Sequence, residues 1–136
     1  MTNNIQPKFE RVMIIDDNVI DLYISKRLII KNFFGKNVLE FFSAEKALLY
    51  LQEHQENLYL LPQIIFIDIH MPGMSGFEFM ETYEKLSDVL KKKCKVFIVS
   101  STIDTNDIER SNKDKNITAF QVKPITKDFL ESIKIV

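Results

Sequence analysis

IIFIDIHMPG, residues 64–73, is the segment that decides the fold of this chain. Three isoleucines and a phenylalanine run directly into an acid, Asp68, and a Pro-Gly pair follows a few residues later. Short runs that are apolar throughout are typical of parallel strands covered on both faces by helices. Such a strand has no structural need for a carboxylate at its end, so Asp68 needs either a partner or a function.

Length and composition exclude several classes of protein. The chain has 136 residues, 46% of them hydrophobic and 27% charged, which suits one globular domain. A net charge of −1 gives no reason to expect nucleic acid or an anionic membrane as the main partner. The single cysteine, Cys94, excludes an internal disulfide. We find no signal peptide and no apolar run long enough to cross a bilayer, so we expect a cytoplasmic protein.

Short apolar segments alternate along the chain with longer segments of helical period. The segments predicted to be strands are 12–16, 38–42, 64–68, 96–100 and 117–122. Apolar side chains mark one face of each helix. These are Ile20, Ile24, Leu28 and Ile29, then Ala47, Leu48 and Leu51, then Phe77, Met80 and Tyr83, and finally Phe129, Leu130 and Ile133. A more polar helix is expected at about 105–113. The candidate N-cap residues are Ser43, Ser75, Asp104 and Thr126.

This alternation indicates an α/β fold, with one parallel sheet and helices on both faces. Among the topologies that right-handed crossovers allow, we expect the flavodoxin-like, doubly wound (βα)5 fold, with five strands in the order 2-1-3-4-5. Residues 1–10 are interpreted as a flexible lead-in and residues 11–136 as one domain. The basic run KKKCK at 91–95 is interpreted as a solvated loop, with a docking surface as the alternative.

Polar residues stand at the ends of four predicted strands. Asp16 and Asp17 end the first strand, Asp68 the third, Ser100 the fourth and Lys123 the fifth. In the predicted fold these ends meet at one edge of the sheet, where open α/β proteins bind their ligands. Two carboxylates about 4 Å apart repel by roughly 4 kcal/mol at an effective dielectric constant near 20, so a proton or a cation must lie among them. Oxygen ligands favour Mg²⁺, and a carboxylate beside Mg²⁺ and a lysine suits phosphoryl transfer.

The ordered set of these residues resembles the receiver domain of two-component response regulators. The matching parts are Ile15-Asp16-Asp17, the run from Asp68 through Met-Pro-Gly to Gly76, Ser100 after an apolar strand, and Lys123-Pro124. The resemblance covers the chain from about Val12 to its end. It implies a stand-alone receiver similar to the chemotaxis response regulator, without an output domain. Because the family is mostly bacterial, it also implies a bacterial cytoplasm.

The resemblance implies a role for each acid. Asp68 would accept a phosphoryl group from the phosphohistidine of a histidine kinase or of a phosphotransfer protein. Asp17 would bind Mg²⁺ directly and Asp16 through metal-bound water, while Asp68 and the backbone carbonyl of His70 would complete the ligands. The imidazole of His70 is the less favoured alternative as a metal ligand.

The resemblance assigns the remaining residues as well. Lys123 would pair with the phosphoryl oxygens, and the bond between Lys123 and Pro124 is typically cis in such domains. Ser100 would bond to the attached phosphoryl group. Phe120 stands at the position of an aromatic switch residue, with simple core packing as the alternative. Ser101 stands where the family usually has a small residue such as alanine, which leaves its effect on dephosphorylation open.

Three functions follow from these residues. The first is a phosphorylatable receiver, monomeric or dimerising on phosphorylation, that switches a protein-binding face made by the helix at 105–113, the strand at 117–122 and the last helix. The second is a receiver fold that serves as a constitutive interaction module, although all the acids and the lysine are present. The third is a haloacid dehalogenase-type phosphatase, which needs an acid two residues after its nucleophile; His70 and Asn18 stand at that spacing. We therefore predict a signalling phosphoacceptor rather than an enzyme that acts on other molecules.

Overall fold

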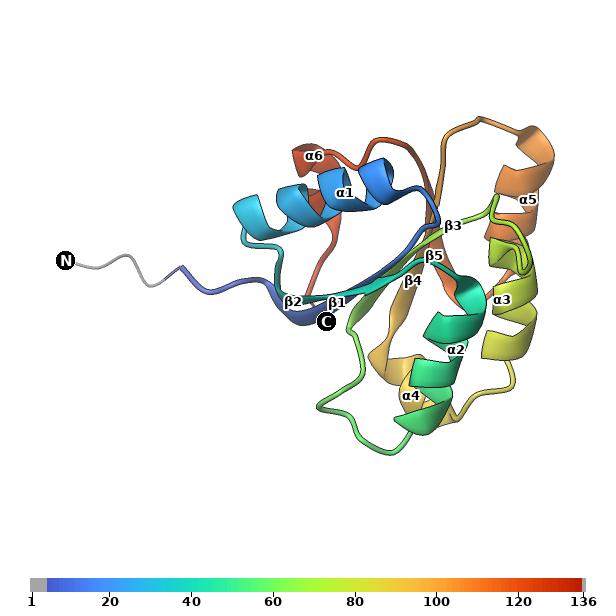
Figure 1. The fold of residues 1–136 in the computed structure, drawn as a ribbon, viewed down its shortest axis with the longest axis horizontal. Coiled ribbons are helices and arrows are strands. Elements are labelled where there is room, and N and C mark those ends of the chain that lie inside the picture. Colours follow the sequence, from blue (N-terminus) through green and yellow to red (C-terminus); the bar gives the residue numbers. More distant parts are fainter. Residues whose placement is uncertain (1–4, 136) are drawn as a thin grey trace.

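The chain is built around a five-stranded parallel sheet (Figure 1). A computed structural model describes residues 5–135, so the first four residues of the predicted lead-in, and Val136, lie outside the described residues. The strands are β1 (Phe9–Ile15), β2 (Gly35–Phe41), β3 (Ile64–Asp68), β4 (Lys95–Ser100) and β5 (Ile117–Val122). Their order is β2-β1-β3-β4-β5, and the paired strands run parallel. The predicted flavodoxin-like fold is confirmed.

Helices cover both faces of the sheet (Figure 1). One face carries α1 (Val19–Lys31) and α6 (Lys127–Ser132), and the other carries α2 (Ala44–Glu53), α3 (Gly76–Tyr83), α4 (Asp88–Lys93) and, beside α3, α5 (Thr105–Lys113). β3 contributes side chains to the hydrophobic cores on both faces of the sheet. Ile65 and Ile67 belong to the core under α2 and α3, whereas Ile64 and Phe66 belong to the core under α1. All five residues of β3 are buried. This two-sided burial explains why the strand is apolar throughout.

Side-chain caps fix where the helices begin. The predicted N-cap residues of α2, α3, α5 and α6 each accept a backbone N–H of the first turn, and they are Ser43, Ser75, Asp104 and Thr126. At α3 the cap is reciprocal, because the side chain of Glu78 accepts the backbone N–H of Ser75. This capping box ends the loop at 69–75 that follows Asp68.

The apolar face predicted for α1 is wrong in part. Ile20 is 70% exposed and Ile24 is 44% exposed, whereas Ile29 of the predicted face is buried against the sheet. Leu22, which the predicted face does not include, is buried there as well. Leu28, the third residue of the predicted face, packs against the same core and is partly buried. Apolar residues occur on almost every side of this helix, so their spacing did not define one face.

The basic run at 91–95 is not a loop. Its first three lysines belong to α4, an additional short helix that Ser87 caps, and its last lysine begins β4. Leu90 and Cys94 are buried and hold this segment on the core.

β1 also differs from its predicted bounds, since it begins at Phe9. The ring of Phe9 packs edge-on against Phe34, with the ring centroids 5.0 Å apart.

Gly76 lies where the backbone leaves no room for a side chain. A Cβ atom there would lie 2.7 Å from the carbonyl oxygen of Asp68 and 2.9 Å from the Cα of Ile69. We therefore expect Gly76→Ala to lower the free energy of unfolding by about 1–3 kcal/mol, measured by urea denaturation. Lys127→Ala, at the exposed first residue of α6, is the matched control and should change it by less than about 0.5 kcal/mol. Equal stability of the two variants would contradict the close approach.

Candidate functional site

Four of the predicted site residues meet at the carboxyl edge of the sheet. Asp16 follows β1, Asp68 and Ser100 are the last residues of β3 and β4, and Lys123 follows β5. The backbone N–H of Lys123 donates to the carbonyl oxygen of Ser100 at 2.7 Å. Asp16, Asp68 and Ser100 are buried, and the side chain of Lys123 is 14% exposed. The strand ends therefore bring two acids, a hydroxyl and an ammonium group to one edge of the sheet, where they are largely shielded from solvent.

The ammonium group of Lys123 lies at the centre of this cluster. Its Nζ is 2.7 Å from Asp16 Oδ2, 2.9 Å from Asp21 Oδ2 and 3.1 Å from Asp68 Oδ2. The peptide bond between Lys123 and Pro124 is cis. Charge-assisted contacts of this length are the strong ones in proteins. One positive charge nevertheless faces three carboxylates, so the cluster has an excess of negative charge.

Burial and pairing have opposite effects on the pKa values of Asp16 and Lys123. Burial raises the pKa of Asp16 above its usual value, while the hydrogen bond from Lys123 and the backbone N–H of Asn18 lower it again. Burial also disfavours the charged form of Lys123, but its hydrogen bonds to Asp16 and Asp21 prevail and raise the pKa of the ammonium group. Lys123 is therefore protonated at neutral pH.

Asp17 extends the cluster toward solvent. One carboxylate oxygen from each of Asp16, Asp17 and Asp68 lies within 4.8 Å of the others, and Asp17 is exposed. A set of oxygen donors with one open side suits a hard divalent cation that keeps part of its water shell, as Mg²⁺ does. The acids that the sequence places at separate strand ends thus lie together, and their donor atoms fit the ion.

His70 connects the loop after Asp68 to α5. Its backbone N–H donates to Asp68 Oδ1 at 3.2 Å, and its imidazole Nε2 lies 3.7 Å from Asp107 Oδ2. The imidazole therefore has an acid of α5 as its partner, and His70 is not part of the three-acid group. A shift of the loop at the acid cluster would therefore change the contact between His70 and Asp107, in the first turn of α5.

Two hydroxyl groups and one aromatic ring flank the cluster. Ser100 is fully buried, and its Oγ accepts a backbone N–H from two residues further along the chain. Ser101 is exposed and lines a hollow of about 210 Å³ together with Asp21 and Lys123. Phe120, on β5, is half-buried and packs against the core under α2 and α3.

Asp21 is the site residue that sequence reasoning missed. It lies in the first turn of α1 and contacts Lys123, which is 102 residues away in sequence. Acids are common in first helical turns because they complement the helix dipole, so its presence there needed no functional explanation. The available signal was its position, four residues after Asp17 at the same end of the helix.

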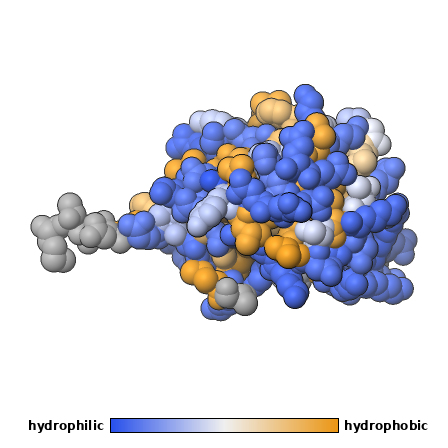
Figure 2. All heavy atoms as spheres, turned by 90° about the horizontal axis from the view of Figure 1, so that it is seen from below, coloured by the Kyte–Doolittle hydropathy of each residue, from blue (hydrophilic) through white to orange (hydrophobic). Residues whose placement is uncertain are grey.

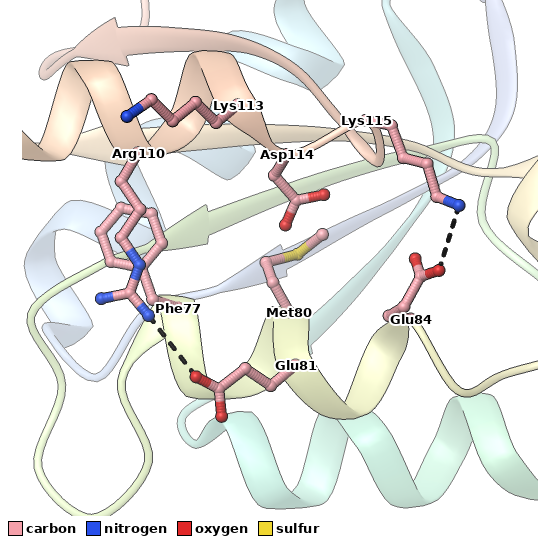
Figure 3. Close-up of a pocket in the computed structure, with 8 residues that line it drawn as sticks. All are labelled: Phe77, Met80, Glu81, Glu84, Arg110, Lys113, Asp114 and Lys115. Atoms are coloured by element: carbon pink, nitrogen blue, oxygen red, sulfur yellow. Dashed lines mark hydrogen bonds and ion pairs between the residues drawn. The ribbon is translucent and has the colours of Figure 1, made fainter.

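A groove of about 590 Å³ lies between α3 and α5 (Figure 3). Arg110 lies over the ring of Phe77, 4.3 Å from its centroid, and its guanidinium is 3.5 Å from Glu81. At the other end of the groove Lys115 pairs with Glu84 at 3.2 Å. One of the nine residues of α5 is buried. Polar contacts across the groove, rather than an apolar face, therefore hold α5 beside α3.

Comparison with known proteins decides the family of the chain, because the response regulator receiver domain family matches residues 12–133. The chain belongs to this family. Similar solved structures include a response regulator receiver protein from Dyadobacter fermentans, at 28% identity and a TM-score of 0.79 over 90% of this chain and 95% of that chain. A two component response regulator from Cytophaga hutchinsonii is also 28% identical, with a TM-score of 0.82 over 91% of this chain and 92% of that chain.

A curated relative of this receiver is much longer. Hybrid signal transduction histidine kinase C from Dictyostelium discoideum is 30% identical over 135 residues, which is 96% of this chain and 10% of that protein. The receiver thus spans about a tenth of the length of that relative. Within residues 5–135 we find no helix that is both long and apolar enough to cross a membrane. The chain is thus a receiver domain of a two-component response regulator, and the family to which it belongs consists of signalling phosphoacceptors.

Proposed function

We propose that this receiver accepts a phosphoryl group on Asp68 and thereby switches a protein-binding surface. The observation that carries the proposal is the position of the Lys123 ammonium, 3.1 Å from Asp68 Oδ2 and 2.7 Å from Asp16 Oδ2. A buried carboxylate beside a fixed positive charge and two further acids is well suited to act as a nucleophile toward phosphorus.

The proposed reaction transfers a phosphoryl group from the phosphohistidine of the donor to the side chain of Asp68. An Asp68 oxygen attacks the phosphorus of a phosphohistidine, the P–N bond breaks, and the imidazole leaves with the electron pair and takes up a proton. The product is a mixed anhydride of the Asp68 side chain and phosphate. Lys123 would offset negative charge on the phosphoryl oxygens, and the buried hydroxyl of Ser100 would donate a hydrogen bond to the group once it is attached.

We further propose that Asp16, Asp17 and Asp68, with the backbone carbonyl of His70, hold one Mg²⁺ ion. The support is the group of carboxylate oxygens within 4.8 Å of one another. When bound, Mg²⁺ supplies positive charge to the phosphoryl oxygens. The excess of negative charge in the cluster is what the ion would neutralise.

The face that changes on phosphorylation is proposed to be α5, β5 and α6. The contact between His70 and Asp107 joins the loop after Asp68 to α5, and Phe120 lies on β5 directly beside β4. Movement of Ser100 toward the phosphoryl group and repacking of Phe120 would therefore bias a two-state equilibrium of this face. The phosphorylated receiver would bind its partner as a monomer or as a phosphorylation-dependent dimer.

The upstream partner is proposed to be a histidine kinase or a histidine phosphotransfer protein. Receivers of this family generally interact with such proteins. We propose the cytoplasm as the site of action, because phosphohistidine is made where ATP is available. The domain bounds 11–136 stay a prediction.

Phosphorylation by a small donor tests the proposal. The purified protein would be incubated with acetyl phosphate or phosphoramidate, with and without Mg²⁺, and its intact mass measured. We expect a gain of one phosphoryl group that requires Mg²⁺ and that hydroxylamine removes, as it does for acyl phosphates. No gain in a folded protein that binds Mg²⁺ would favour a constitutive interaction module.

Asp21 should slow phosphorylation in this receiver. Its carboxylate shares Lys123 with Asp68 and adds a negative charge where an anionic phosphoryl group enters. We expect Asp21→Asn to raise the initial rate of phosphorylation by acetyl phosphate about threefold, since like charge near a site slows the approach of an anion. Asp21→Glu keeps the charge and serves as the control, with a rate close to that of the unchanged protein. A slower Asp21→Asn variant would instead show that Asp21 positions Lys123.

A further inference from the structure

A second hollow gathers positive charge at the amino-terminal edge of the sheet, opposite to the acid cluster. Its volume is about 320 Å³, and it is lined by four lysines, one amide and two apolar side chains: Lys92, Lys93, Lys95, Lys134, Gln63, Phe9 and Ile135. These residues come from four separate segments: the start of β1, the residue before β3, the last turn of α4 with the start of β4, and the chain after α6. The face of the molecule seen from below is largely hydrophilic around a smaller hydrophobic area (Figure 2). Because the lining residues come from separate segments, the fold of the chain, and not the basic run at 91–95 alone, makes this hollow.

The charges of this hollow are not balanced by acids. Its lining contains four lysines and no acidic residue. Within the described part of the chain, none of these lysines takes part in an ion pair, although lysines elsewhere do, such as Lys91 with Asp88 and Lys115 with Glu84. The groove between α3 and α5 is different, because its three basic side chains face three acidic ones (Figure 3).

A purely structural role explains only half of these lysines. Lys92 and Lys93 lie in the last turn of α4, where positive charge complements the helix dipole. Lys95 begins a strand and Lys134 follows the last helix, so neither gains from this effect. Both nevertheless line the same hollow as the other two.

We propose that this hollow binds a compact polyphosphate anion, such as the phosphate groups of a nucleotide or an inorganic oligophosphate. The lysine ammonium is a compact charge that suits phosphate oxygens from several directions. A hollow of this volume lies at the lower end of the range of small-ligand sites, and its concave shape does not suit a flat membrane. The side-chain amide of Gln63 adds a hydrogen-bond donor, because its oxygen already accepts the backbone N–H of Glu10.

Calorimetric titration with inorganic tripolyphosphate, in magnesium-free buffer of low ionic strength, tests this site. We expect one binding site, with affinity that falls as salt is added. Lys95→Gln and Lys134→Gln should each weaken binding about threefold to fivefold, as expected for one partly exposed charge pair. Lys46→Gln removes an exposed lysine from α2 and should leave the affinity unchanged. Asp68→Asn should also leave it unchanged, since the acid cluster lies at the other edge of the sheet.

Three outcomes would overturn the proposal. The first is no detectable binding of tripolyphosphate by a folded protein. The second is an equal loss of affinity in Lys46→Gln and Lys95→Gln, which would indicate diffuse attraction of anions. The third is tighter binding of a hexaglutamate peptide than of tripolyphosphate, which would assign the hollow to an acidic segment of a partner protein. None of these outcomes depends on whether Asp68 is phosphorylated.

Discussion

Asp68→Asn should abolish phosphorylation by acetyl phosphate under conditions in which the unchanged protein gains a phosphoryl group. A neutral amide lacks the charged oxygen that attacks phosphorus, so no acyl phosphate can form. The substitution also removes one of three carboxylates that share Lys123. The variant should therefore be at least as stable toward urea as the unchanged protein, and intact mass with a parallel denaturation curve measures both properties.

Asp88→Asn is the matched control for this experiment. Asp88 lies on α4, and its side chain is 90% exposed and pairs with Lys91. Its replacement removes the same charge and introduces the same residue, but far from the acid cluster in the fold, so phosphorylation should proceed at the usual rate. Phosphorylation of the Asp68→Asn variant to the same extent as the control would show that a residue other than Asp68 is the acceptor.

Lys123→Met should make the stability of the protein strongly dependent on pH in the absence of Mg²⁺. The variant leaves buried carboxylates without their cation, and breaking a buried pair in this way costs about 3–5 kcal/mol. Asp16 already has a raised pKa because of its burial, and the variant removes the contacts from Lys123 that lower it. An acid with a raised pKa in the folded state favours folding while it is protonated and loses this contribution as the pH rises through that pKa. The loss should therefore be larger at pH 7.5 than at pH 5.

Urea denaturation of Lys123→Met at the two pH values measures this difference. Added Mg²⁺ should restore part of the stability at pH 7.5, because a cation again lies among the acids. Lys127→Met changes an exposed lysine of α6 and should show neither the large loss nor the pH dependence. An equal loss at both pH values would mean that lost packing of the lysine stem, and not unpaired charge, destabilises the variant.

The sequence predicted the sheet better than it predicted the helix faces. β3 begins and ends where its apolar run does, because burial on both faces imposes an unbroken pattern. β5 also has its predicted bounds, although it contains polar residues and is mostly half-buried. α1 has apolar side chains on nearly all sides, and the contacts that choose between Ile24 and Ile29 are tertiary. α4 was missed for the opposite reason, since its six residues carry one buried side chain, Leu90, and three consecutive lysines.

The site was predictable where it depends on strand ends and not where it depends on a helix. Asp16, Asp68, Ser100 and Lys123 meet because parallel strands end at one edge. The third acid beside Lys123 is Asp21, and its reach across to β5 depends on how α1 packs over the sheet. Such a contact between residues far apart in sequence leaves no local pattern.

α5 has a consequence for engineering that follows from its polar attachment. The helix is held through its residues Arg110 and Asp107, which contact Glu81 and His70, and through Lys115, two residues beyond its end, which pairs with Glu84. One of its nine residues is buried. Most positions on it are therefore free to change at about 0.5 kcal/mol or less in stability. A library randomised over its exposed positions could thus be selected for new binding partners while the phosphoacceptor chemistry at the strand ends stays intact. The receiver would then serve as a sensor scaffold with an interchangeable recognition helix.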